Sequence, residues 1–327
     1  MTDGRAGGSR VRTVFLGSGH FWVEALRRLA GHPDVDLVGV VTAPPRTAGR
    51  RQQITPTEID TAARALGDPA ILTPARLRTP EAVASVVELR PDLVVLSDYG
   101  QLVPPALLGF RHGALNLHPS LLPRHRGAVP IPAAILAGDP EAGVTLMQMD
   151  EGLDTGPILA QRRVPLRGTE TAPSLEEALA LVAADLLDET VAPWLRGEIA
   201  PRPQAVDGAT LTRPLRRADG RLDPARPAVE LERQVRAYQP WPGSFIDSDL
   251  GRIVVWAASV GPATAATPGT PGTPGTPGTF GPEGLATVDG QLRLHEVQPA
   301  GGTRMSWEAF RRGHPGIIGS AALASDP

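Results

Sequence analysis

One stretch of the chain, residues 113–156, constrains the fold and the chemistry more than any other part of the sequence. It reads GALNLHPSLLPRHRGAVPIPAAILAGDPEAGVTLMQMDEGLDTG. Residues 114–118 alternate apolar and polar side chains, so in a strand Asn116 and His118 leave the same face. Pro119 then ends regular pairing. The run therefore predicts a strand that ends on two neighbouring polar side chains.

A second strand is predicted from Val144 to Met149, and it leads into a turn that contains Asp154. Gly152 and Gly156 flank this residue and let the backbone turn sharply, which presents the carboxylate at a strand end. An amide, an imidazole and a carboxylate then meet at one end of the predicted sheet. This set suits acyl transfer, which needs a donor for an oxyanion, a group that moves protons and an anion that holds the imidazole.

The N-terminal half alternates strand and helix patterns. Near-continuous apolar runs, typical of strands covered on both faces, predict strands at 11–16, 37–42 and 93–97. The glycine turn 17–19 after the first strand opens a helix at about 21–29, as in a Rossmann-like unit. Trp22 stands where a dinucleotide-binding motif needs its third glycine, so NAD binding is disfavoured. These patterns predict an α/β domain with a Rossmann-like sheet.

Further elements continue this pattern to residue 197. They are a short strand at 71–72, a helix from Pro80, a helix at about 131–137, a strand at 158–166 and a helix that reaches 195. The last helix is expected to begin at a capping box, Ser174 to Glu177, and to stop at Gly197.

The C-terminal part has a different composition and a different pattern of elements. Residues 198–213 are rich in proline and polar residues, which is typical of a linker. From 214 to 327 a helix carries Leu231, Val235 and Tyr238 on one face. Short strands separated by glycine turns, at 252–256, 285–288 and 291–294, predict a small β-barrel. Residues 267–279 repeat Thr-Pro-Gly, and such low complexity predicts a mobile loop between two strands.

The composition bounds the kind of protein. The chain has 327 residues, enough for two domains, and no apolar run of ~18 residues that would cross a membrane. The absence of cysteine excludes disulfides, thiolate metal sites and a cysteine nucleophile. A secretory signal is not apparent, so a cytoplasmic location is expected. The net charge of −3 means that contact with nucleic acid has to come from local basic patches.

The motifs resemble a known family. The N-x-H run at Asn116, the S-L-L-P run at 120–123 and the L-D-T-G run at 153–156 occur in the order and spacing of the folate-dependent formyltransferases. Within that superfamily the chain is most similar to the members that formylate methionyl-tRNA. The segments 237–243 and 298–301 resemble landmarks of these members, so the resemblance spans nearly the whole chain. It implies an OB-like C-terminal domain that binds tRNA.

The resemblance also implies a reaction. The α-amine of initiator methionyl-tRNA attacks the formyl carbon of 10-formyltetrahydrofolate and creates an oxyanion, for translation initiation. Asn116 is expected to donate to this oxyanion, and His118 to stabilise it or move protons. Asp154 is expected to orient His118 and help accept the proton of the amine. Ser120, Leu121, Leu122 and Pro123 are expected to line the folate site, with no metal and with a monomeric enzyme.

The loop after the second strand is the candidate contact for tRNA phosphates. It resembles the family's insertion at the same place, which wedges against the acceptor end of the tRNA. Its cations are Arg46, Arg50 and Arg51, although members of the family often carry lysine where this chain has Gln52 and Gln53. Arginine offers a planar fork that suits phosphate.

Three other functions stay open at the level of sequence. A sugar-nucleotide N-formyltransferase uses the same three catalytic residues and donor with another acceptor. A formyltetrahydrofolate hydrolase passes the formyl group to water. A non-catalytic tRNA-binding protein with a vestigial site is the alternative from another class, and the intact Asn116, His118 and Asp154 argue against it.

Overall fold

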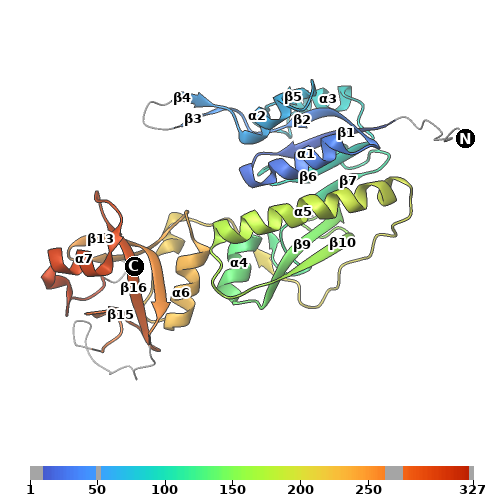
Figure 1. Ribbon diagram of the computed structural model, residues 1–327. Helices are drawn as coiled ribbons and strands as arrows, with labels where there is room; N and C mark the ends of the chain where they lie inside the picture. The colour runs from blue at the N-terminus through green and yellow to red at the C-terminus, as the bar shows by residue number, and fades with distance from the viewer. Residues whose placement is uncertain (1–9, 49–52, 262–274, 324–327) are drawn as a thin grey trace, which may run out of the picture. The chain divides into compact units, whose positions relative to one another are not determined.

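The chain divides into two units by its internal contacts, and each unit is described by itself (Figure 1). The computed structural model describes residues 10–48, 53–261 and 275–323. The first unit comprises Met1–Pro130, Glu141–Pro165 and Glu176–Thr212, and the second comprises Ile131–Pro140, Leu166–Leu175 and Arg213–Pro327. The domain boundaries at 197 and 213 stay a prediction.

Within the described residues, the first unit is built on a seven-stranded sheet with the order β10-β9-β7-β6-β1-β2-β5. Its strands are β1 Val11–Gly17, β2 Val35–Val41, β5 Ala70–Leu72, β6 Leu93–Ser97, β7 Ala114–His118, β9 Glu141–Gln148 and β10 Ile158–Pro165. The five strands from β7 to β5 run parallel, whereas β9 and β10 are antiparallel to their neighbours. The predicted α/β fold class with a Rossmann-like sheet is confirmed.

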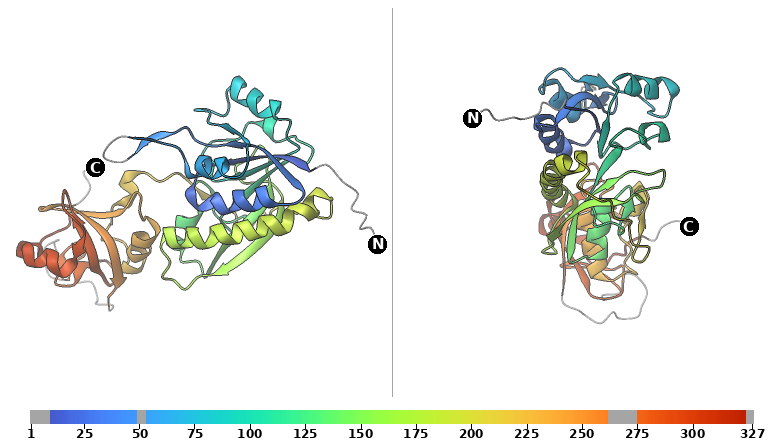
Figure 2. Two further views of the ribbon diagram at one scale, coloured as in Figure 1. Left: turned by 45° about the horizontal axis from the view of Figure 1, so that its top comes forward. Right: turned by 90° about the vertical axis from the view of Figure 1, so that its right-hand side faces the viewer.

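Helices cover both faces of this sheet. The helices of the first unit are η1 His20–Trp22, α1 Val23–Gly31, α2 Glu58–Arg64, α3 Pro80–Glu88, η2 Pro105–Leu107 and, from Glu176 onward, α5 Ala172–Leu195. Helix α4 Pro130–Ala137 belongs to the second unit from Ile131 onward. The crossover from β1 to β2 and the one from β5 to β6 move across the sheet in opposite directions, so their right-handed helices α1 and α3 lie on opposite faces. Helix α5 lies beside α1 (Figures 1 and 2), and Arg28 pairs with Asp185 at 3.4 Å.

The near-continuous apolar runs form the interior strands of the sheet, because these strands are covered on both faces. Val14, Phe15 and Leu16 of β1 and Val94 and Val95 of β6 are fully buried. A strand covered on both faces has no solvent side, so its sequence does not alternate. This rigid centre holds the ends of β1, β6 and β7 at one edge of the sheet.

The start of α5 corrects one local prediction. The helix begins at Ala172, and its reciprocal cap joins Thr171 and Ser174 rather than Ser174 and Glu177. The N–H of Thr171 donates to Ser174 Oγ at 3.0 Å, and the N–H of Ser174 donates to Thr171 Oγ1 at 3.4 Å. Pro173 fits the first turn because its missing N–H would find no helical partner there.

The loop after β2 is a hairpin rather than an irregular loop. Strands β3 Arg46–Ala48 and β4 Gln53–Thr55 pair antiparallel. Arg46 lies on β3 and is exposed. Arg50 and Arg51 lie outside the described residues.

The second unit carries the predicted antiparallel sheet. Its described strands are β12 Ser244–Ser248, β13 Gly251–Val260, β14 Phe280–Gly281, β15 Gly284–Ala286, β16 Gln291–Pro299 and β17 Met305–Ser306. Its helices are η3 Arg217–Gly220, α6 Ala228–Ala237, α7 Trp307–Gly313 and η4 Pro315–Ile317. The sequence did not predict β12, β14, β17 or α7, because each is short and its apolar residues show no period of their own.

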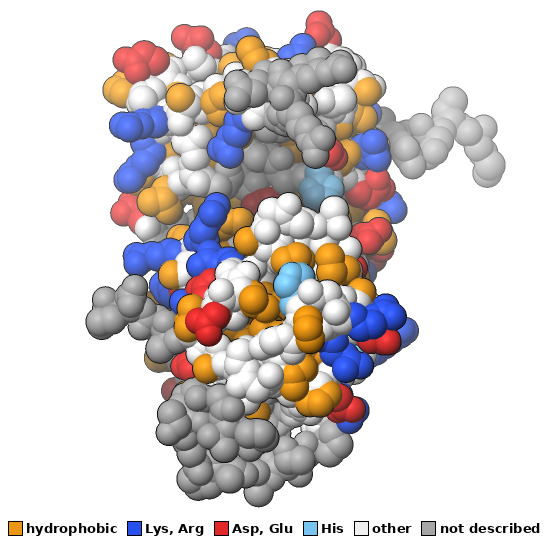
Figure 3. Space-filling view, turned by 90° about the vertical axis from the view of Figure 1, so that its left-hand side faces the viewer, with side chains coloured by type: hydrophobic (Ala, Val, Ile, Leu, Met, Phe, Trp, Pro, Cys, Tyr) orange, Lys and Arg blue, Asp and Glu red, His pale blue; other side chains and the backbone are white. Residues whose placement is uncertain are grey.

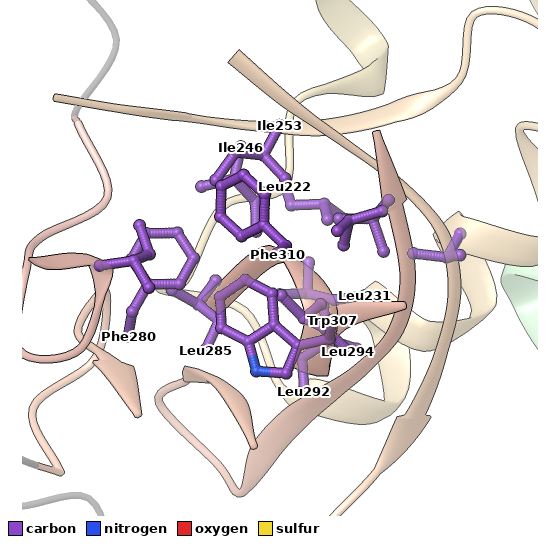
Figure 4. Close-up of a cluster of buried hydrophobic side chains, with 14 residues drawn as sticks. Leu222, Leu231, Ile246, Ile253, Phe280, Leu285, Leu292, Leu294, Trp307 and Phe310 are labelled. Carbon is purple, nitrogen blue, oxygen red and sulfur yellow. The ribbon is translucent and has the colours of Figure 1, made fainter. Parts of the chain in front are cut away.

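The core of this unit gathers aromatic and aliphatic side chains from the sheet, α6 and α7 (Figure 4). The ring of Trp307 stacks on Phe280 and on Phe310 at centroid distances of 6.0 and 5.6 Å. The indole N–H of Trp307 donates to the carbonyl of Pro282 at 3.0 Å, so the buried ring leaves no polar atom unpaired. Leu231 and Val235 of α6 are buried in the same cluster, as their spacing predicted.

The end of the Thr-Pro-Gly repeat is part of this structure, which corrects the prediction of a mobile loop up to residue 279. Residues 267–274 lie outside the described residues, but Thr276 and Thr279 are buried. The N–H of Gly278 donates to Ala286 at 2.9 Å, and its carbonyl accepts from Ala322 at 2.7 Å. The last triplet is ordered because it leads directly into Phe280, which is fixed in the core.

Candidate active site

Three of the predicted site residues meet at the carboxyl end of β7. Asn116 and His118 occupy alternate positions of this strand and are only 6% and 4% exposed. Strand β9 pairs with β7 and delivers the turn that contains Asp154. The register of the sheet, together with this turn, therefore brings residues about forty positions apart into one site.

The carboxylate of Asp154 is held by two N–H donors. Its Oδ1 accepts from Asn116 Nδ2 at 3.3 Å, and its Oδ2 accepts from the backbone N–H of Gly127 at 2.7 Å. Gly127 has a φ of +99°, and a Cβ there would lie 2.4 Å from the carbonyl of Thr212, so only glycine fits. The anion is thus fixed between the strand and the loop that follows it.

His118 is oriented mainly by a backbone carbonyl. Its Nε2 lies 2.9 Å from the carbonyl oxygen of His125, which can only accept, so Nε2 carries the proton. Its Nδ1 faces Asp154 Oδ2 at 3.7 Å, which is longer than a direct hydrogen bond. Asp154 therefore lies near Nδ1 of His118 without a direct hydrogen bond to it. The carbonyl of His125 orients the ring through Nε2, which is the role that was expected of Asp154.

Burial lowers the pKa of the His118 imidazole, and the nearby His125 acts in the same direction. The charge of Asp154 and the carbonyl of His125 oppose this change. The net effect keeps the ring neutral at neutral pH. A neutral ring with its proton on Nε2 has its basic lone pair on Nδ1, the atom that faces Asp154.

The S-L-L-P run is anchored from inside the protein. The hydroxyl of Ser120 donates to the carbonyl of Arg124 at 2.7 Å, and Leu122 packs with Met147 and Ile158. Thr145 of β9 accepts from the N–H of Leu122 at 3.1 Å. The side chains of Ser120 and Leu122 point inward, and a folate-lining role for residues 120–123 stays a prediction.

The segment predicted as a linker, 198–213, contributes to the site. Arg202 forms a β-bridge with Ile158, and strand β11 Leu211–Thr212 pairs with β8 Arg126–Gly127. Between these points, Gln204 contacts the turn of Asp154 at 2.8 Å. Sequence reasoning missed this contact, because a glutamine in a proline-rich segment matches no motif.

A cavity of about 610 Å³ opens at the same edge of the sheet, beyond the ends of β1, β2 and β6. Its lining includes Ser18, Arg46, Asp98 and Tyr99. Glu176 of α5 is not part of this lining, but it feels the charge of Asp98, which is. Burial, and then that charge, raise the pKa of the Glu176 carboxyl to about 7. The sequence predicted the glycine turn here but not the cavity, since residues from five separate segments line it.

Within the described residues, no group of three histidine or acidic side chains is placed to hold a metal ion. None of the described helices is both long and apolar enough to cross a membrane.

The chain matches two family models. The model described as formyl transferase matches residues 11–191, and the one described as formyl transferase, C-terminal domain, matches residues 214–315. The methionyl-tRNA formyltransferase of Symbiobacterium thermophilum is 42% identical over 93% of this chain and 92% of its own length. That of Gluconacetobacter diazotrophicus is 44% identical over 95% of this chain and 99% of its own.

Solved structures share the fold at lower identity. HypX from Aquifex aeolicus in complex with tetrahydrofolic acid is 18% identical with a TM-score of 0.58, and the match covers 93% of this chain and 47% of HypX. This chain thus spans about half the length of HypX. The sugar 3N-formyl transferase WlaRD is 15% identical with a TM-score of 0.62, covering 88% of this chain and 98% of WlaRD.

We expect the His118 imidazole to titrate below its ordinary pKa of about 6.5, because burial disfavours the charged ring. Since the unfolded chain takes up this proton at higher pH than the folded chain, the contribution of the residue to stability is complete above pH 6.5. It is lost as the pH falls through the folded pKa. NMR titration of the ring, assigned with a His118→Gln variant, measures the midpoint, and a value at or above 6.5 contradicts the prediction.

Proposed function

The chain belongs to the formyl transferase family, and we propose that Asn116, His118 and Asp154 are the residues with which it transfers a formyl group from 10-formyltetrahydrofolate to the α-amine of initiator methionyl-tRNA. The names of the relatives that match most of the chain support methionyl-tRNA as the acceptor. The observation that carries the choice of residues is that one carboxylate contacts the amide of Asn116 and faces the imidazole of His118.

The buried amide of Asn116 fits the carbonyl of a formyl donor. When the amine forms its bond to the formyl carbon, the electron pair of the carbonyl moves to oxygen. Asn116 Nδ2 has two hydrogens, and one of them contacts Asp154. The second is the donor for the developing oxyanion, and at 6% exposure of the residue, little water competes with it.

Proton transfer falls to His118 and Asp154. The amine becomes positively charged as its bond to the formyl carbon forms, and it has to lose a proton before the carbon–nitrogen bond to the folate breaks. The lone pair on His118 Nδ1 and the carboxylate of Asp154 face each other at 3.7 Å, so either can take this proton. The departing folate nitrogen then receives a proton from the same pair.

The remaining parts of the chain bind the two substrates. In this proposal residues 1–197 carry out formyl transfer, with 120–123 beside the folate, and residues 214–327 bind the tRNA. Arginine and acidic side chains are interspersed on the face shown in Figure 3. With a net charge of −3 for the whole chain, the tRNA contact is proposed to rely on local arginines. The enzyme acts as a monomer in the cytoplasm, where initiator tRNA is used.

The decisive assay supplies purified protein with 10-formyltetrahydrofolate and charged initiator tRNA, followed by mass analysis of the aminoacyl group. We expect a gain of one formyl group on methionine. Loss of the formyl group at the same rate without tRNA would indicate the hydrolase instead. Transfer to an amino-sugar nucleotide, with none to tRNA, would indicate the sugar enzyme.

We expect Asn116→Ala to lower the single-turnover rate by ~10²–10³, the usual cost of losing one oxyanion donor. Binding of folate and tRNA is expected to change little, because the donor acts mainly in the transition state. The melting temperature serves as the control for folding. A variant that folds and keeps a near-normal rate removes Asn116 from the mechanism.

Arg46 is proposed to contact phosphates at the acceptor end of the tRNA, because it is exposed on β3 and lines the cavity at the site edge. Arg46→Ala should weaken binding of charged tRNA at low salt and leave folate binding intact. Arg111→Ala removes an exposed arginine ahead of β7, at the opposite end of that strand from His118. Equal loss in both variants, or in neither, rejects a specific contact at Arg46.

A further inference from the structure

The two loops of the site each contain a residue with an unfavourable backbone. His125 has a φ of +57° and Asp154 a φ of +53°, in the left-handed region that residues with a Cβ rarely adopt. His125 supplies the carbonyl that orients His118, and Asp154 supplies the carboxylate. Such conformations carry a cost that surrounding contacts offset.

One side chain, Gln204, contacts both loops. Its Nε2 donates to the carbonyl of Asp154 and to that of Gly156, each at 2.8 Å. Its Oε1 accepts from Nε and Nη2 of Arg126, the residue after His125, at 3.0 and 2.7 Å. The carboxamide thus uses two donors and one acceptor atom to join the turn of Asp154 to the loop after β7.

Gln204 is itself placed by its neighbours in the chain. On one side, Arg202 exchanges two backbone hydrogen bonds with Ile158, at 2.8 and 2.9 Å. On the other, Thr210 accepts from the N–H of His125 at 2.8 Å through its hydroxyl and from that of Arg126 at 2.9 Å through its carbonyl. The backbone around Gln204 is fixed at both ends, so its side chain can hold the loops rather than follow them.

We propose that Gln204 is a positioning residue for formyl transfer, which sets the place of the Asp154 carboxylate relative to His118. This inference rests on the proposed function of these two residues. The turn also approaches β9 closely at Gly156, where a Cβ would lie 1.8 Å from the carbonyl of Gln148, so Gln204 acts on a turn that is already held at one end. Without Gln204, the carbonyl of Asp154 loses the hydrogen bond from Nε2. The side chain that contacts both the turn of Asp154 and Arg126 is then missing.

The test compares two variants of Gln204 with a matched glutamine. Gln204→Ala removes all contacts, whereas Gln204→Glu keeps an acceptor for Arg126 but cannot donate to the two carbonyls. Gln234 has the same pattern in the second unit: its Nε2 donates to the carbonyls of Asp219 and Arg221, and its Oε1 accepts from Arg226 at 2.9 Å. Gln234→Ala therefore measures the cost of losing such a carboxamide away from the site.

We expect both Gln204 variants to lower the single-turnover rate at saturating substrates by up to about 10²-fold, the cost of misplacing a catalytic group by roughly 1 Å. The KM values for folate and tRNA should change by less than the rate. Gln234 is only 1% exposed and so is not itself a tRNA contact, and Gln234→Ala should lower the melting temperature and keep the rate at saturating substrates. A wild-type rate in Gln204→Glu, or an equal rate loss in Gln234→Ala, overturns the proposal.

Failure of the proposed function is recognised separately. If the wild type does not formylate methionyl-tRNA, the rate cannot be used. The midpoint of the His118 titration by NMR then tests whether Gln204 positions Asp154 relative to His118. A midpoint that shifts in Gln204→Ala and not in Gln234→Ala supports the role, because the charge of Asp154 acts on this ring. An unchanged midpoint in both variants overturns it.

Discussion

The carboxylate of Asp154 is the contact on which the site depends. It accepts from an amide on β7 and from a backbone N–H in the loop that follows, and it faces the imidazole on the same strand. A charge in a mostly buried place needs such donors, because it has lost much of its water. These same donors fix where the carboxylate sits, so the anion and the amide of Asn116, the proposed oxyanion donor, are placed together.

The sheet makes this placement rigid. Strand β9 is antiparallel to β7, so the turn of Asp154 leaves β9 beside Leu115, whereas the other loop of the site leaves β7 at His118. The turn reaches the site because Asp154 contacts Asn116 of β7. The interior strands are buried on both faces and cannot shift without exposing apolar surface. The loops are less regular, and the segment from Arg202 to Thr212 holds them by backbone and side-chain hydrogen bonds.

The fold leaves the acceptor of the reaction open. A Rossmann-like sheet with a polar trio can serve several formyl acceptors, because in the proposed mechanism the trio contacts the formyl group and not the rest of the acceptor. Selection of the acceptor then has to come from other surfaces, and the hairpin that carries Arg46 and the second unit are the ones proposed for it. The similarity of the whole chain to enzymes that act on methionyl-tRNA is what favours that acceptor.

The sequence by itself determined the interior strands and the residue types of the site. Continuous apolar runs became β1 and β6, and the period of a strand places Asn116 and His118 on one face of β7. The pairing of β7 with β9 then brings Asp154 to them. Only the tertiary structure decided that the carbonyl of His125 orients His118, that Gln204 joins two loops and that the end of the repeat is buried. These contacts depend on which distant segments the fold brings within hydrogen-bond distance, and such pairings leave no periodic pattern in the chain.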